Sequence, residues 1–207
     1  MKGILLSTRP KWCEKIASGE KTIEVRKTAP KEVPFKAFIY CTKDKPYLYR
    51  VDDDNNFELT NTLRPKTYEY VKDYNEQNGK IIGEFVCDKV YEYTFSHYEA
   101  EYRVTHIEQD AMWLNQPELI RYGKGKPLYG WHISDLKIYD KPKELSEFKT
   151  PPCEKPEKAC EQCKYLVVIN TPDMYEVDCF VENGREITRP PQSWMFVEEI
   201  ESGKEKQ

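Results

Sequence analysis

The chain has 207 residues, of which 39% are hydrophobic, 13% aromatic and 33% charged. This content is enough for one packed domain, or for one domain with a small appendage, and it excludes a disordered chain. The formal net charge of −4 excludes a protein that coats long duplex nucleic acid, because such binding requires a broad basic surface.

The beginning of the chain contains one short apolar run, Ile4–Leu6, which is shorter than the roughly 7 to 15 residues of a secretory signal. No other apolar segment approaches the roughly 20 residues that cross a bilayer. Seven cysteines, an odd number, indicate reduced thiols or metal ligands rather than a disulfide framework. We therefore expect a soluble, cytoplasmic protein with no membrane partner.

The first elements in chain order are a strand, a helix and two further strands. Residues 3–8 form an apolar strand, and Pro10 begins a short helix that ends at Gly19. Residues 22–26 alternate with period two, which places Ile23 and Val25 in the core and the polar residues on the opposite face. Residues 35–42 are apolar on both faces, as in a strand that is covered on two sides.

The middle of the chain continues this mixture of strands and helices. The predicted elements are a polar insertion at 43–61, a helix at 65–77, a long strand at 81–93, a helical region at 108–126 and a strand at 128–140. Pro117 interrupts the helical region and suits the first turn of a second helix. Strands with helices at their sides predict an α+β fold of barrel type rather than a doubly wound sheet.

The composition changes near residue 150, where proline, charge and cysteine become frequent. Two apolar strands and the turn at Asn183-Gly184 then predict a small β-hairpin unit. The predicted organisation is a main domain at 1–145, a cysteine-rich β-hairpin extension at 150–200 and a mobile tail at 201–207.

Four cysteines of this extension form a candidate metal site: Cys153, Cys160, Cys163 and Cys179. Four thiolates can close a tetrahedral zinc site, which would stabilise a unit that has little core of its own. The alternative is that these cysteines are reduced and carry no metal. The remaining three cysteines lie in predicted core elements and are expected to be small buried hydrophobes. No organic cofactor is expected.

Residues 1–31 are basic within an acidic chain. The basic residues are Lys2, Arg9, Lys11, Lys15, Lys21, Arg26, Lys27 and Lys31, opposed by Glu14, Glu20 and Glu24. The same segment contains a strand, then S-x-R-P, then a short helix that ends in G-x-K-x-x-E-x-R. The residues of this pattern are Ser7, Arg9, Pro10, Gly19, Lys21, Glu24 and Arg26.

This pattern resembles the ASCH family, a branch of the PUA-like barrels, and weaker similarity extends to about residue 140. The resemblance implies a mixed β-barrel of about five or six strands, flanked by short helices. It also implies a cleft beside the motif that accepts RNA, single-stranded nucleic acid, a nucleotide or a nucleoside.

The candidate nucleic-acid-binding residues are Arg9, Lys11, Lys21, Glu24, Arg26 and His132. Cations suit phosphate, and a carboxylate suits the exocyclic N–H of a base. The alternative is that Glu24 and Arg26 form an ion pair on a solvated sheet face. Trp12, Trp131 and Tyr129 are candidates for base stacking, although their spacing fits the apolar core better.

Catalysis is an alternative that the resemblance raises, because some bacterial ASCH proteins are amidohydrolases that remove the acetyl group of acetylcytidine. They use a Lys and a Thr of the motif and a more distant Glu. Lys21 fits, but Glu24 stands where the hydroxyl nucleophile is expected and cannot replace it. Thr22 does not occupy that position either.

We therefore predict a noncatalytic, regulatory module that binds RNA or a nucleotide. Lys21 and Glu24 are catalytic candidates only in the amidohydrolase alternative. A third hypothesis is that the C-terminal hairpin binds a protein partner.

Overall fold

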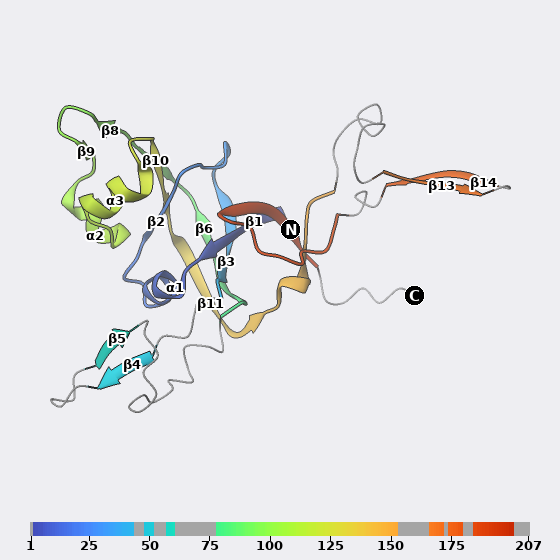
Figure 1. Cartoon of the computed structure of the whole chain (residues 1–207), viewed down its shortest axis with the longest axis horizontal. Helices are drawn as coiled ribbons and strands as arrows, with labels where there is room; N and C mark the ends of the chain where they lie inside the picture. Colours follow the sequence, from blue (N-terminus) through green and yellow to red (C-terminus); the bar gives the residue numbers. More distant parts are fainter. Residues whose placement is uncertain are drawn as a thin grey trace.

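Two β-sheets form the centre of the computed structural model, with the helices beside them (Figure 1). The structure describes residues 2–43, 48–51, 57–60, 78–152, 166–171, 174–179 and 184–200. In sheet order, the large sheet contains β11 (Ser134–Lys143), β6 (Ile81–Cys87), β3 (Phe35–Cys41), β1 (Lys2–Thr8), β15 (Trp194–Glu199) and β12 (Phe148–Lys149). Strands β1 and β3 are parallel and the other pairs antiparallel, so this sheet is mixed.

The small sheet is antiparallel, in the order β2 (Ile23–Arg26), β10 (Leu128–His132) and β7 (Val90–Tyr93). The helices are α1 (Pro10–Ala17), α2 (His106–Met112), α3 (Gln116–Gly123) and a 3-10 turn, η2 (Leu145–Glu147). Three hairpins complete the described elements: β4 (Leu48–Val51) with β5 (Phe57–Thr60), β8 (Phe95–Ser96) with β9 (Glu101–Tyr102), and β13 (Leu166–Thr171) with β14 (Met174–Cys179).

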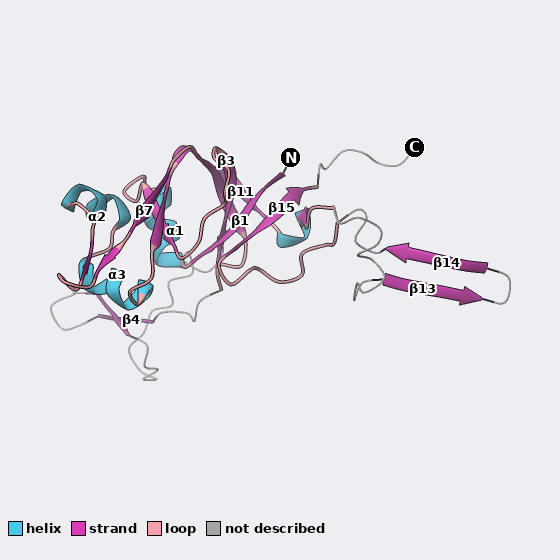
Figure 2. Ribbon diagram, turned by 90° about the horizontal axis from the view of Figure 1, so that it is seen from above, coloured by secondary structure: helices cyan, strands magenta, loops and turns pink. Residues whose placement is uncertain are grey.

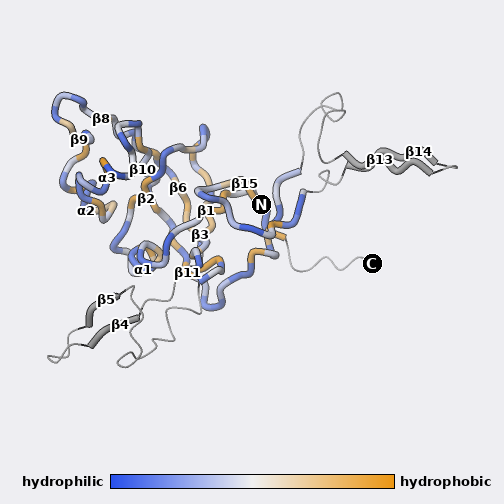
Figure 3. The backbone as a smooth tube through the Cα atoms, in the orientation of Figure 1, coloured by the Kyte–Doolittle hydropathy of each residue, from blue (hydrophilic) through white to orange (hydrophobic). Residues whose placement is uncertain are grey.

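The core lies on both faces of the large sheet, as the apolar runs predict. Along β1, Ile4 and Leu6 face one apolar cluster and Leu5 faces another, because successive side chains of a strand point to opposite faces. A third cluster fills the space between the small sheet and the pair α2 and α3, and it includes Ile23 and Val25 as expected. Figure 3 shows the hydrophobic residues concentrated along the central strands.

The two helices predicted around Pro117 are confirmed, with Pro117 in the first turn of α3. Each begins with a reciprocal capping box, formed by Thr105 with Glu108 and by Asn115 with Glu118. Because each box fixes the start of a helix, the helical spacing of apolar residues begins again at α3 after the short break that follows α2. Among the described residues, no helix is long and apolar enough to cross a membrane.

A closed barrel, which the resemblance implied, is not formed by the described part of the chain. Strand β10 ends at His132, and β11 then pairs with β6 of the large sheet instead of continuing in the small one. At the end of β10, the His132 amide donates to the carbonyl of Lys89, which lies between β6 and β7. The long strands predicted at 81–93 and 128–140 are therefore each divided between two sheets.

The C-terminal part differs from the prediction of one extension at 150–200. Strand β15 lies between β1 and β12 in the large sheet, where Val197 is fully buried. Strands β13 and β14 pair with each other in a separate two-stranded sheet (Figure 2). The helix predicted at 65–77 and the tail at 201–207 lie outside the described residues.

Cys13, Cys41 and Cys87 are buried thiols, as expected. Burial raises the pKa of Cys87 to about 12, and hydrogen bonding with Cys41 together with burial raises the pKa of Cys13. Because the thiolate is the reactive form, iodoacetamide at a pH of about 8 should alkylate all three about 100-fold more slowly in the native protein than in denaturant. Peptide mass spectrometry measures this, and equal rates would contradict the burial.

Trp131 is the largest fully buried side chain, and its ring packs edge-on against Phe35 and Trp194 at centroid distances of 5.0 and 5.8 Å. Trp131→Ala should lower the free energy of unfolding by about 3 to 5 kcal/mol, because it leaves a cavity between the two sheets. Urea unfolding measures the change. Tyr98→Ala, at a 99% exposed position, is the matched control and should change it by less than about 0.5 kcal/mol.

Candidate functional site

A cleft of about 1050 Å³ opens where the end of β1 meets the start of α1. Its other walls are β2 and the residues after it, α3, and residues 191–193, which lead into β15. The lining residues are Ser7, Thr8, Arg9, Trp12, Lys21, Glu24, Val25, Arg26, Lys27, Thr28, Thr42, Leu114, Glu118, Arg121, Tyr122, Pro191, Gln192 and Ser193. Segments from both ends of the sequence thus build one site.

The cleft is basic although the chain is acidic. Among the described lining residues, five are cationic and two are carboxylates: Arg9, Lys21, Arg26, Lys27 and Arg121 against Glu24 and Glu118. The chain as a whole carries a formal net charge of −4. The positive potential is therefore local, and it favours an anionic ligand.

Three charged side chains are buried together at the floor of the cleft. The exposed fractions of Lys21, Glu24 and Arg26 are 2%, 5% and 7%. Glu24 Oε1 lies 2.7 Å from Arg26 Nη2, and Glu24 Oε2 lies 3.5 Å from Lys21 Nζ. We call these three residues the buried triad. The ion pair between Glu24 and Arg26 is therefore present, but it is buried and does not lie on a solvated sheet face as the alternative expected.

Lys21 connects the triad to the end of α2. Its ammonium donates to the carbonyls of Met112 and Ile23, at 2.5 and 2.9 Å. Met112 is the last residue of α2, so Lys21 binds a helix C-terminal carbonyl and places a cation at the negative end of the helix dipole. Burial lowers the pKa of Lys21, and the Glu24 carboxylate opposes this shift.

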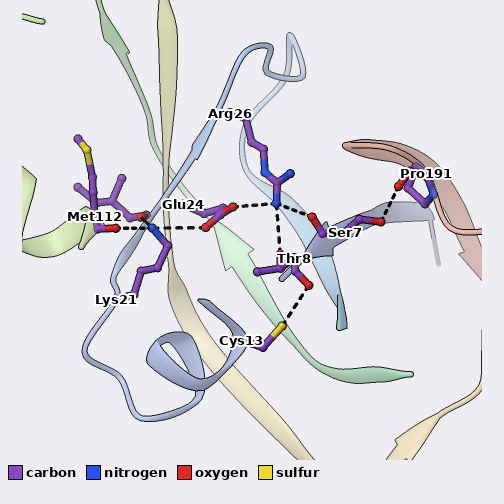
Figure 4. A network of polar contacts seen from close by, with 9 residues as sticks. Ser7, Thr8, Cys13, Lys21, Glu24, Arg26, Met112 and Pro191 are labelled. Carbon is purple, nitrogen blue, oxygen red and sulfur yellow. Dashed lines mark hydrogen bonds and ion pairs between the residues drawn. The ribbon is translucent and has the colours of Figure 1, made fainter. Parts of the chain in front are cut away.

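Arg26 connects the triad to β1 on the other side. Its Nη2 donates to the Ser7 carbonyl at 2.8 Å and to the Thr8 hydroxyl at 3.2 Å. The Ser7 hydroxyl donates in turn to the Pro191 carbonyl at 2.6 Å, and the Ser7 amide donates to the Ser193 carbonyl. Figure 4 shows this row of contacts running from Met112 through the triad to Pro191.

Gly19 allows Lys21 to enter this floor. It follows α1 with a φ of 77°, in the left-handed region that glycine adopts at little cost. The chain turns there, and the Lys21 amide donates back to the Lys15 carbonyl. The spacing G-x-K in the sequence thus reflects a helix stop followed at once by a buried cation.

A family model described as the ASCH domain matches residues 6–169. The chain belongs to the ASCH family. The matched range extends beyond residue 145, where the main domain was predicted to end, and includes part of the cysteine-rich segment. Residues of the ASCH motif supply the floor of the cleft.

Solved structures of the ASCH protein from Zymomonas mobilis are similar to this chain. One is 17% identical, covers 69% of this chain and 73% of its own, and has a TM-score of 0.41. A mutant of that protein is 14% identical, covers 93% of this chain and 86% of its own, and has a TM-score of 0.47. No curated protein matches the sequence.

The structure brings together four of the six predicted binding residues, namely Arg9, Lys21, Glu24 and Arg26. Lys11 and His132 are not among the cleft-lining residues. His132 is half-buried and its Nδ1 lies 2.6 Å from Asp88 Oδ1, at the opposite end of β10 from the residue that pairs with Arg26. His132 therefore lies where the chain passes from β10 of the small sheet to β11 of the large sheet, away from the cleft.

Some cleft residues were not predicted from the ASCH motif. Arg121 and Tyr122 follow Glu118 at helical spacings of three and four, so one face of α3 carries all three into the cleft. Trp12, expected in the core, is half-buried and lines the cleft. Tyr129 and Trp131 are outside the lining, and Trp131 belongs to the core.

The zinc prediction concerns side chains outside those the structure describes. Among the described residues, no group of three or more His, Cys, Asp or Glu side chains could hold a metal ion. Zinc at Cys153, Cys160, Cys163 and Cys179 stays a prediction, which metal analysis of the purified full chain would test.

Removing the carboxylate of the triad should be costly, because it leaves two buried cations without a counter-charge. We expect Glu24→Ala to lower the free energy of unfolding by about 3 to 5 kcal/mol. Combining Glu24→Ala with Lys21→Met should cost less than the sum of the single changes, since the second removes one of the stranded cations. Urea unfolding of the four proteins measures this coupling.

Glu14→Ala is the matched control, because Glu14 is exposed on α1 and has no ion pair to a described residue. It should change stability by less than about 0.5 kcal/mol. Strict additivity of the Glu24 and Lys21 changes would contradict the triad.

Proposed function

We propose that this ASCH protein binds RNA or a nucleotide in the cleft beside its G-x-K-x-x-E-x-R motif and does not catalyse a reaction on it. The observation that carries the proposal is the excess of five cationic over two acidic side chains among the described residues of one cleft, in an acidic chain. Nucleic acid and nucleotides are anionic ligands that suit such a potential.

Aromatic side chains in the same cleft support a ligand that also has a flat face. Trp12 and Tyr122 are half-buried and line the cleft. Lys11 and Lys21 lie 4.6 and 5.2 Å from the Trp12 ring centroid, and Lys27 lies 4.9 Å from that of Tyr122, so a base would stack on the part of each ring that these cations leave open. Stacking of one base on such a ring contributes about 1 to 3 kcal/mol and tolerates any base. Charge and stacking together favour an unpaired base over a rigid duplex.

The contacts of the triad favour binding over catalysis. Lys21 Nζ has three acceptors, and both oxygens of Glu24 face a cation. A nucleophile or general base needs an open position toward the substrate, and these groups are engaged in holding the fold. Glu24 also replaces the hydroxyl that the amidohydrolase alternative requires.

Binding of a short single-stranded RNA, measured by fluorescence anisotropy over about 25 to 300 mM salt, should weaken steadily as salt rises. Arg121→Ala and Lys27→Ala should each weaken binding about three- to tenfold at low salt and flatten the salt dependence. Both residues line the rim of the cleft outside the buried triad, so the variants should fold.

Arg103→Ala is the matched control, since Arg103 is exposed and lies outside the cleft lining. It should leave affinity and salt dependence unchanged. Absence of RNA and nucleotide binding at low salt, or an equal loss in Arg103→Ala, would contradict the proposed site.

Incubation with acetylcytidine, followed by mass spectrometry, tests the noncatalytic part of the proposal. We expect the acetyl group to be retained. Deacetylation that disappears in Lys21→Met would show instead that the cleft is an amidohydrolase site.

A further inference from the structure

The inner end of the cleft joins a helix N terminus to a buried guanidinium. Helix α1 begins after Arg9, which makes no side-chain capping bond to any described residue, and its first turn contains no acidic side chain. The partial positive charge at this end of the helix dipole is therefore not offset locally. Thr8, Arg9 and Arg26 line this same end of the cleft.

The Arg26 guanidinium is only partly used by the protein. All its contacts with described residues pass through Nη2, to Glu24, Ser7 and Thr8. Its Nε is buried and has no hydrogen-bond partner in the described part of the chain. Figure 4 shows the other terminal nitrogen of Arg26 outside this row of contacts. Nε itself is closed off by the protein, so the donor that remains for a ligand in the cleft is this other terminal nitrogen.

Residues 191–193 form the wall beside Arg26. They are fixed to β1 by the hydrogen bonds from the Ser7 hydroxyl to Pro191 and from the Ser7 amide to Ser193. A phosphate in the middle of an RNA chain is a diester, and the nucleotides on both of its sides must leave the cleft. A phosphomonoester needs only one such way out, and its second negative charge pairs more strongly with the cations than a phosphodiester does.

A neighbouring pocket of about 710 Å³ is unfavourable for an RNA strand that continues out of the cleft past Leu114 and Glu118. It shares Leu114 and Glu118 with the cleft and adds the carboxylates of Glu20 and Asp110. These acidic side chains repel a second phosphate. The cations of the cleft therefore favour one compact anion over an extended backbone.

We infer that the inner end of the cleft is a subsite for a phosphomonoester, seated between the Arg26 guanidinium, the Thr8 hydroxyl and the N terminus of α1. Arg9 adds a cation at the rim. The phosphomonoester belongs to a nucleoside monophosphate or to a phosphorylated RNA end. This inference rests on the proposed function and specifies the ligand class of the same site.

The test compares ligands that differ only in the phosphate. Labelled six-nucleotide RNAs with a hydroxyl at both ends, a 5′-phosphate or a 3′-phosphate are titrated with the full-length protein. A nucleoside and its monophosphate are added as competitors. At least one phosphorylated RNA should bind about tenfold more tightly than the hydroxyl form, or the monophosphate should compete where the nucleoside does not. The ligand that gains affinity shows whether the phosphate belongs to a 5′ RNA end, a 3′ RNA end or a free nucleotide.

Variants locate the subsite. Arg26→Lys should remove the preference for phosphate, because a single ammonium cannot reproduce the planar set of donors. If Arg26→Lys fails to fold in a thermal melt, the exposed Arg9→Ala decides, and it should reduce the preference about threefold. Arg103→Ala is the control and should keep the full preference.

The two proposals fail in different ways. RNAs that bind equally with and without a terminal phosphate, together with a monophosphate that competes no better than its nucleoside, would overturn the phosphomonoester subsite and leave the RNA-binding cleft standing. Loss of all binding at low salt would remove both. A phosphate preference that survives in Arg26→Lys and Arg9→Ala would place the phosphate elsewhere and overturn the subsite.

Discussion

The burial of two cations around one carboxylate is the constraint on which the rest of the structure depends. Glu24 lies between Lys21 and Arg26, and removing its carboxylate leaves two buried cations without a counter-charge. Lys21 also donates to the Met112 carbonyl, and Arg26 Nη2 donates to the Ser7 carbonyl. The triad thereby joins α2, β2 and β1 into one floor.

The same constraint explains how a binding cleft can be basic in an acidic protein. The buried cations are held by the fold, while Arg9, Lys27 and Arg121 add charge at the rim, where solvent and salt can screen it. Floor and rim therefore have different roles. The floor sets the shape and the position of a deep donor, and the rim attracts the ligand.

Local signals in the sequence account for part of this site. The helix stop at Gly19 and the period-two alternation of Glu24 and Arg26 predicted a polar cluster after α1, and Pro117 marked the start of α3. Arg121, Tyr122 and Ser193 reach the cleft only through tertiary packing of segments about a hundred residues or more away in sequence. The strand alternation that placed His132 on a polar face could not show where β10 would leave the small sheet.

We propose that ligands bind in the cleft above the buried triad. Titrating the full-length protein with a nucleoside monophosphate and following backbone amide NMR signals tests it most directly. Saturable shifts should concentrate at Thr8, Arg26, Tyr122 and Ser193, and Lys137 on β11 should be unaffected. Shifts that concentrate around Lys137 or the β8 and β9 hairpin, or no shifts at all, would contradict it.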